Sequence, residues 1–531
     1  MDTKTSLPKF TPTKHTDTEF PNHHEELVWY INRLESDSSL NTYKAPYDDH
    51  YDIMRYLKYL DKPVTVWGRV SEARHQQELS FLKIQDGTSF KPLQCVIDWT
   101  QHETQRETWQ KIKLRSSIVV TGIIRESPQE LKKFQRVELH VQSIEIQGLS
   151  DPEVCPMKKR VTLQQVREYP ELAFSSRFKM ASLRIRHVAS MGTHEFFDQR
   201  KFWYTHTPLI TGADCEGAGE VVQSTTMFNK TVSLIPQKND KVDFSKDQYG
   251  KPSYLTVSGQ LHVEGACLAY QRVYTFGPFF RAEGTCSRKH LSEGWMVEPE
   301  HIVREETGLN DTIDLAVSYI KHLIGYTLKR CPDEIDFCDS KFMKPGHREY
   351  LELLLEKPTV TISYDDVIEL LLDAQTQGKV KFETIVTKEM DLDAEHEKWI
   401  VEYFDNAIVA VMLFPKDIKA FYMKESPSNP NRVESFDILV KDIGEIVGGS
   451  VREHRLEKLQ QVIESRGMDQ NTLDFYMRMR TFGTAPHAGF GLGFDRMIMM
   501  LTGYTGYDSG KQHPDIREVM PYPRQSGSII C

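Results

Sequence analysis

The chain has 531 residues, of which 39% are hydrophobic and 27% charged, and its formal net charge is −10. This length predicts more than one domain, and the acidic balance excludes a uniformly basic surface, so any RNA contact needs a local basic patch. The eight cysteines form no CxxC pair, which argues against a zinc module or a disulfide scaffold and favours a reducing compartment. There is no run of 18 apolar residues, and MDTKTSLPKF is typical of neither a secretory nor an organelle signal, so we expect a cytoplasmic protein without a membrane span.

The first 60 residues are polar and carry no chemical motif. Residues 24–35 and 51–61 have apolar side chains at helical spacing. We therefore expect a helical extension over residues 1–60 that packs on the next domain. The alternative is a docking segment for a partner or for RNA.

Residues 61–148 are typical of a small β-barrel. Alternating apolar side chains and turn residues predict five strands, at 64–70, 79–87, 92–98, 117–125 and 137–148. A helical insert is expected at 100–113. Five short strands with such an insert favour a Greek-key barrel of the OB type, a fold that presents a strand face to single-stranded nucleic acid.

Residues 149–175 contain three prolines and the basic run Lys158-Lys159-Arg160, which predicts an interdomain linker. The basic run is either a contact to the phosphate backbone of an RNA or a solvated charge run. A second domain is expected over residues 176–531, beginning with a long amphipathic helix at 177–202. Further along, 418–423 and 436–440 are interpreted as antiparallel strands around a hydrophilic turn.

Two stretches of this second domain indicate a site for a polyphosphate. In residues 276–300, a strand bearing Arg281 is followed by a cationic loop and a second strand with acidic residues at alternate positions. A guanidinium is a planar, permanently charged group that suits a pair of phosphate oxygens. Residues 485–501 carry alternate glycines, which let the backbone approach closely, and then Arg496 at a strand-to-helix junction. Each stretch alone also fits a surface hairpin or a close-packed strand and helix.

Together these stretches resemble motifs two and three of the class II aminoacyl-tRNA synthetases. The residues that carry this resemblance are Phe280-Arg281-Ala282-Glu283 and the block GFGLGFDR at 489–496. Four more segments are similar to the asparaginyl branch of the family, namely TPLITGADCEGAGE (207–220), LTVSGQLHVE (255–264), FPKDIKAFYM (414–423) and GEIVGGSVRE (444–453). The resemblance implies an α+β fold, with an N-terminal OB-type barrel and an antiparallel catalytic sheet flanked by helices.

The resemblance also implies an activity, the ATP-dependent ligation of asparagine to tRNA(Asn) with Mg²⁺ as cofactor, in a homodimer formed through the helix at 177–202. It assigns catalytic roles to Arg281, Arg496 and His290, and the metal to Glu445, with Asp437 as a weaker second ligand. The residues that it implies for ATP are Arg281, Glu283, Lys289, His290, Glu445, Gly493 and Arg496.

For the amino acid, the resemblance implies Glu216, Glu220, Ser258, Gln260, Glu298 and Arg452. Val263 stands where the aspartyl relatives carry a lysine, and the loss of that cation favours an amide substrate. Phe81 and Gln94 match the positions that stack on and hydrogen-bond to an anticodon base; Phe81 could otherwise belong to the barrel core.

Some positions depart from the family pattern. Lys289 replaces an arginine, and Gly294 replaces the phenylalanine that stacks on adenine; the neighbouring Trp295 should point to the opposite face of its strand. Residues 504–514 are an extra segment. These changes keep two alternatives open: a paralogue that adenylates Asn or Asp but transfers it to a non-tRNA acceptor, and an inactive RNA-binding paralogue.

Overall fold

The computed structural model describes residues 59–131, 135–157, 163–213, 221–229, 231, 234–282, 290–340, 344–508, 511–527 and 529. The chain divides into two compact units, Met1–Lys159 and Arg160–Cys531. The helical extension expected over residues 1–60 lies outside the described residues, except for its last two. Within the described residues, no helix is both long and apolar enough to cross a membrane.

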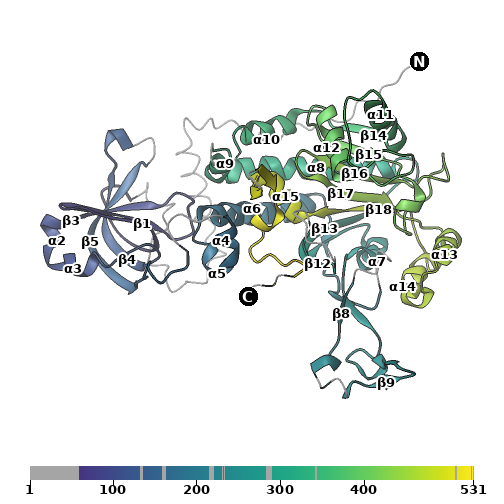
Figure 1. Cartoon of the computed structure of the whole chain (residues 1–531), viewed down its shortest axis with the longest axis horizontal. Coiled ribbons are helices and arrows are strands. Elements are labelled where there is room, and N and C mark those ends of the chain that lie inside the picture. The colour runs from purple at the N-terminus through teal and green to yellow at the C-terminus, as the bar shows by residue number, and fades with distance from the viewer. Residues whose placement is uncertain are drawn as a thin grey trace. The chain divides into compact units, whose positions relative to one another are not determined.

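The first unit is a closed five-stranded barrel, which confirms the expected OB-type fold (Figure 1). Its strands are β1 (Pro63–His75), β2 (Leu79–Gln85), β3 (Leu93–Asp98), β4 (Ser117–Glu126) and β5 (Val137–Gly148), joined in the order β1-β2-β3-β5-β4. The helical insert is also present, as α2 (Trp99–His102) and α3 (Arg106–Trp109). Strand alternation places Leu82 and Ile84 in the buried core and leaves Phe81 half-buried on the outer face.

The second unit is organised by an eight-stranded sheet of order β14-β15-β16-β17-β18-β13-β12-β6 (Figure 1). Its strands are β6 (Trp203–Tyr204), β12 (Arg272–Phe280), β13 (Glu293–Ile302), β14 (Val360–Ser363), β15 (Val409–Met412), β16 (Ser435–Val440), β17 (Gly444–Val451) and β18 (His487–Gly493). The pairs from β15 to β12 are antiparallel. The predicted hairpin and the predicted glycine-rich strand therefore become neighbours in space, since β13 pairs with both β12 and β18.

Two long helices, α6 (Arg177–Gln199) and α8 (Gly308–Arg330), pack against each other and against one face of this sheet. Phe197 of α6 stacks on Tyr274 of β12 with 4.6 Å between ring centroids. The opposite face carries α7 (Gln260–Tyr270), whose Val263 and Cys267 form a buried cluster with Val273. The polar side chains of the site lie on this second face.

The remaining helices surround the sheet: α4 (Leu163–Glu168), α5 (Pro170–Ala173), α9 (Pro332–Cys338), α10 (His347–Glu356), α11 (Tyr364–Thr376), α12 (Ala394–Tyr403), α13 (Leu456–Ser465), α14 (Gln470–Thr481) and α15 (Phe494–Thr502). Smaller sheets are formed by β7 (Ile210–Thr211), β11 (Ser253–Leu255) and β8 (Val222–Ser224), and by β9 (Gln237–Lys238) with β10 (Lys241–Val242). The extra segment at 504–514 forms a hairpin of β19 (Thr505–Asp508) and β20 (Lys511–Pro514).

The prediction of a strand at 418–423 is wrong. This stretch follows a short 3-10 helix, Lys416–Ile418, and makes only an isolated bridge between Met423 and Arg452. The neighbours of β16 in the sheet are instead β15 and β17. The reason lies in two consecutive aromatic residues: Phe421 and Tyr422 are both buried against α13 and α14, whereas a strand would place them on opposite faces.

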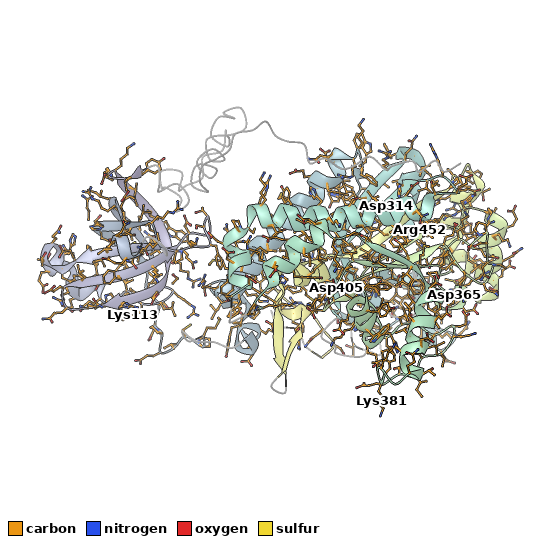
Figure 2. All side chains as sticks on the ribbon, turned by 90° about the horizontal axis from the view of Figure 1, so that it is seen from above. Lys113, Asp314, Asp365, Lys381, Asp405 and Arg452 are labelled. Atoms are coloured by element: carbon orange, nitrogen blue, oxygen red, sulfur yellow. The ribbon has the colours of Figure 1, made fainter. Side chains whose placement is uncertain are left out.

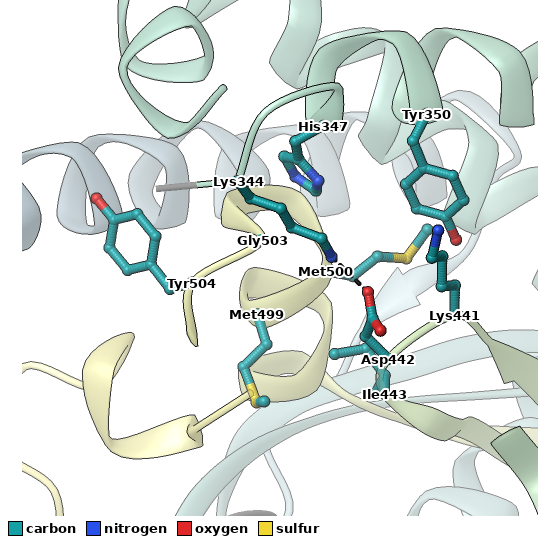
Figure 3. A pocket seen from close by; sticks show the side chains of 10 residues that line it. All are labelled: Lys344, His347, Tyr350, Lys441, Asp442, Ile443, Met499, Met500, Gly503 and Tyr504. Carbon is teal, nitrogen blue, oxygen red and sulfur yellow. Dashed lines mark hydrogen bonds and ion pairs between the residues drawn. The ribbon is translucent and has the colours of Figure 1, made fainter. Parts of the chain in front are cut away.

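His347 joins the start of α10 to the end of α15 (Figure 3). Its Nε2 donates to the Leu501 carbonyl oxygen at 3.1 Å, and its ring lies against Gly503, the left-handed residue that ends α15 with φ of 61°. Burial, and then the charge of Lys344, lower the pKa of His347 to about 4. The imidazole is therefore neutral in the folded protein at pH values where an exposed histidine is already charged.

This burial makes the stability of the second unit depend on pH. Because the pKa of His347 is lower in the folded chain than its ordinary value of 6.5, the stabilisation is present above pH 6.5 and is lost as pH falls toward 4. Over this range the wild type should lose about 3 kcal/mol of unfolding free energy more than His347→Gln. Urea unfolding followed by fluorescence between pH 7 and pH 4 measures the difference. His187→Gln, at an exposed position, is the control, and parallel slopes for wild type and His347→Gln would contradict the assignment.

Candidate nucleotide and amino-acid site

A cavity of about 120 Å³ opens on the polar face of the sheet, between β12, β13, β17 and the junction of β18 with α15. It brings together five residues predicted from the sequence: Arg281, His290, Glu445, Gly493 and Arg496. The full lining is Phe279, Arg281, His290, Leu291, Trp295, Met296, Glu445, Ile446, Gly491, Gly493, Asp495, Arg496 and Ile516. Three potential cations around one small cavity suit an anionic ligand such as a polyphosphate.

Arg496 is oriented by β17. Its Nη1 donates to the Glu445 carbonyl oxygen at 2.6 Å and lies 3.8 Å from the Glu445 carboxylate. On the opposite side of the cavity, the backbone N–H of Arg281 donates to Ser292, and its guanidinium carbon lies 5.4 Å from the centre of the Phe279 ring. The Arg496 guanidinium is therefore held by a backbone carbonyl, and Arg281 is held through its own backbone, which favours a preformed anion site.

Two carboxylates meet beside the cavity. Glu445 of β17 and Asp437 of β16 both face Gly448: a Cβ on that glycine would lie 2.9 Å from Glu445 Oε1 and 3.6 Å from Asp437 Oδ1. Burial, opposed by the charge of Lys419 and reinforced by that of Glu445, raises the pKa of Asp437 to about 6. Lys419 Nζ pairs with Asp437 Oδ2 at 2.5 Å. The absent side chain at Gly448 leaves room where a cation bound by both carboxylates would lie.

Further along the same sheet face, Glu298 of β13 is buried beside the start of α7. It accepts a hydrogen bond from the Ser258 hydroxyl and another from the Gly259 backbone N–H at 2.9 Å. Gln260 is also buried, and its amide Nε2 donates to Glu264 at 3.0 Å. Three predicted amino-acid ligands, Ser258, Gln260 and Glu298, are thus held on one polar surface, although the carboxylate of Glu298 is anchored to the loop before α7.

Arg452, which Figure 2 labels, is buried in the second unit. It forms an ion pair with Glu300. Its Nε donates to Glu300 Oε2 at 3.2 Å and its Nη1 to the Ser450 hydroxyl at 2.8 Å, while the guanidinium lies over the Tyr422 ring. Burial raises the pKa of Glu300 to about 7, although the positive charge of Arg452 lowers it. The guanidinium of Arg452 is thus already paired with a carboxyl group of the protein before any substrate arrives.

Behind this pair, the carboxylate of Glu264 in α7 accepts hydrogen bonds from a cluster of buried side chains. It accepts from Tyr476, from Arg480 at 2.8 Å and from His487 at 2.9 Å. Burial opposes ionisation, yet Arg480 and His487 hold the pKa of Glu264 well below its usual range. Within the described residues, no group of three or more His, Cys, Asp or Glu side chains is arranged to hold a metal ion.

The barrel carries the two residues predicted for the anticodon. Phe81 lies on β2, and Gln94 lies on β3 in register with Lys83. The amide of Gln94 donates to Glu138 at 3.3 Å. Strand alternation places Phe81, Lys83 and Gln85 on the same outer face of β2, so an aromatic ring and a cation are presented together.

Four predicted site residues, Glu216, Glu220, Glu283 and Lys289, lie outside the described residues. The sequence interpretation also missed Glu300, Glu264, Lys419 and Phe279. Alternation along β13 could have indicated Glu300, since it stands two residues after Glu298. Phe279 could have been found by aligning the two strands of the predicted hairpin. Glu264 and Lys419 gave no local signal, because their partners are distant in the chain.

Comparisons with known proteins agree with this geometry. The family described as tRNA synthetases class II (D, K and N) matches residues 163–526, and the OB-fold nucleic acid binding domain matches residues 64–147. The asparagine–tRNA ligase of Clostridium beijerinckii is 38% identical over 88% of this chain and 96% of its own length. That of Cytophaga hutchinsonii is 37% identical over the same shares.

Among solved structures, the asparaginyl-tRNA synthetase of Pyrococcus horikoshii in complex with asparaginyl-adenylate is similar with a TM-score of 0.73 and 26% identity. The match covers 89% of this chain and 97% of that one. This chain matches these relatives along most of its length. It also contains the cationic side chains beside glycines, the buried Arg452 and the closed barrel described above. The chain belongs to the class II tRNA synthetases of the D, K and N group, in the family of the asparagine–tRNA ligases.

Proposed function

We propose that this protein joins L-asparagine to tRNA(Asn) through an asparaginyl-adenylate formed from ATP. The observation that carries this proposal is the order of side chains along one face of β13. Met296 borders the cationic cavity, and Glu298 and Glu300 follow on the same face of the strand, with Glu300 paired to Arg452. At about 3.3 Å per residue, Met296 at the cavity and Glu300 at the Arg452 ion pair lie roughly 13 Å apart along β13.

In the first step, an asparagine carboxylate oxygen forms a bond to the α-phosphorus of ATP, and the bond to the departing pyrophosphate breaks. Such a transfer depends on in-line positioning and on neutralising charge more than on proton transfer. Arg281 is the proposed contact of the α-phosphate and the substrate carboxylate. His290 and Arg496 are the proposed contacts of the terminal phosphates. In the second step, a terminal ribose hydroxyl of tRNA attacks the acyl carbon, and AMP leaves.

Glu445 and Asp437 fit a Mg²⁺ ion that is shared with ATP. Carboxylate oxygens plus phosphate oxygens are the usual ligands of this ion, and the empty side of Gly448 lies between the two carboxylates. The ion would offset negative charge on the phosphates during transfer. Lys419 holds Asp437 in place and limits the net negative charge of the pair.

Arg452 and Glu298 are the proposed readers of the substrate side chain. A guanidinium donates to the amide oxygen, and a carboxylate accepts from the amide nitrogen. Because the guanidinium of Arg452 is already paired with Glu300, a second carboxylate entering here would lack a free cation. An aspartate would also leave one polar partner without its hydrogen bond, at a cost of about 1–3 kcal/mol. Glu216 and Glu220 are proposed contacts of the substrate ammonium, and Glu283 and Lys289 of ATP.

The remaining proposals concern partners. The barrel face of Phe81 and Gln94 would bind the anticodon by stacking and by hydrogen bonding. Homodimerisation is proposed through α6 and the strand that follows it, and a cytoplasmic location is proposed from the scattered cysteines. Among the described residues, five cysteines have free thiols.

The decisive experiment is ATP–pyrophosphate exchange with Asn and Asp in parallel, followed by acylation of tRNA(Asn). Asn-dependent exchange together with charged tRNA(Asn) is the expected result. Exchange without charging would favour a different acceptor. Tight tRNA binding without exchange would favour an inactive RNA-binding paralogue.

Glu445→Gln should raise the Mg²⁺ concentration needed for half-maximal exchange by at least roughly 10-fold, because it removes a charged ligand. A magnesium titration at saturating Asn and ATP measures this shift. Glu402→Gln, on the exposed side of α12, changes the same charge away from the cavity and should leave the titration unchanged. An unchanged titration for Glu445→Gln would argue against this residue as a ligand.

Phe81→Ala should lower kcat/KM for tRNA(Asn) by roughly 10- to 100-fold, because it removes the stacking surface for a base. Exchange without tRNA is the internal control and should keep its wild-type rate, since it does not involve the barrel. Equal loss in both reactions would show a folding defect rather than an anticodon contact.

A further inference from the structure

The β12–β13 hairpin places the only phenylalanine of the cavity lining against a glycine. Phe279 and Gly294 are directly opposite each other in the strand register. A Cβ on Gly294 would lie 2.6 Å from Phe279 Cε1, 2.7 Å from its Cζ and 2.9 Å from Asp495 Oδ2. Real Cβ atoms do not approach ring carbons this closely, so the Phe279 ring occupies the space of a side chain at position 294.

The Phe279 ring is half-buried and lines the cavity that holds Arg281 and Arg496. It rests over the Gly294 backbone, with the Arg281 guanidinium 5.4 Å from the ring centre. Across the cavity, Gly491 and Gly493 contribute no side chains that would fill the space before the ring. A flat aromatic surface beside phosphate-binding cations matches a nucleotide, whose base and phosphates need these two environments.

The neighbouring aromatic residue does not take this position. The ring of Trp295 packs edge-on against Phe276, with 5.5 Å between centroids. Phe276 is an odd number of residues from Phe279 along β12 and so lies on the other face of the sheet. The sequence expectation for Trp295 agrees with this placement.

We propose that Phe279 is the surface on which the purine base of ATP and of the adenylate stacks, a role that rests on the proposed function. The stacking ring comes from β12 because Gly294, its partner on β13, has no side chain. Only one of these two positions has room for a ring, since their side chains would overlap. The aromatic surface expected from the family at position 294 is thus supplied from the adjacent strand.

The first test compares Phe279→Leu with Phe279→Tyr. Leucine keeps most of the apolar volume but has no π face, so KM for ATP in the exchange reaction should rise roughly 10- to 100-fold. KM for Asn should change less than twofold, because Asn does not contact the ring. Phe279→Tyr keeps the ring and should retain the wild-type KM for ATP.

The second test moves the ring. Gly294→Phe alone should impair ATP use, because two rings then compete for one space. The double variant Phe279→Ala/Gly294→Phe should recover ATP use relative to Phe279→Ala. A residue that only packs the hairpin would not produce this rescue, which separates a stacking role from a structural one.

The outcomes separate this proposal from the ligase proposal. If wild type exchanges and Phe279→Leu keeps the wild-type KM for ATP, or raises the KM for ATP and Asn equally, base stacking on Phe279 is overturned and the ligase stands. If wild type shows no exchange, the ligase proposal fails, and calorimetric titration with ATP alone still decides the role of Phe279. Absence of ATP binding by folded wild type would overturn both.

Discussion

The buried ion network around Arg452 and Glu264 fixes the relative positions of strands and helices in the catalytic unit. Arg452, the residue directly after β17, pairs with Glu300 of β13, and Glu264 of α7 accepts from Arg480 of α14 and His487 of β18. A charge enclosed in protein is tolerated only with a partner in contact, and removing one partner costs about 3–5 kcal/mol. These pairs therefore fix the positions of three strands and two helices that are far apart in the chain.

The same network shapes the proposed amino-acid subsite. Gln260 is oriented by Glu264, and Glu298 by Ser258 and Gly259, so each polar group on the substrate side is backed by a second hydrogen bond. Side chains held in this way lose little freedom when a ligand binds, which favours both affinity and selectivity. The pairing of Arg452 with Glu300 adds an electrostatic reason for a neutral amide. The rigidity of the network and the preference for asparagine thus have a common physical origin.

Much of this could be predicted from the sequence, for identifiable reasons. The side chains of the barrel strands alternate between core and surface, and the β12–β13 hairpin is formed by residues close in the chain. Both could therefore be predicted from the sequence. The prediction of a strand at 418–423 was wrong because its aromatic residues pack on α13 and α14, which lie further along the chain. The partners of Glu264 and Arg452 depend on contacts across roughly 150 to 220 positions, which no local pattern reports.

The overlap of Phe279 with position 294 has an evolutionary consequence. A chain with the ring on one strand and a chain with the ring on the other are separated by two substitutions, and neither intermediate is favourable. One intermediate has no ring, and the other forces two rings into the space of one. Lineages would therefore stay in whichever arrangement they inherited. An inhibitor that occupies the space beside the stacked base would contact a differently shaped surface in each of the two arrangements. Two enzymes that catalyse the same reaction could therefore be inhibited selectively at this position.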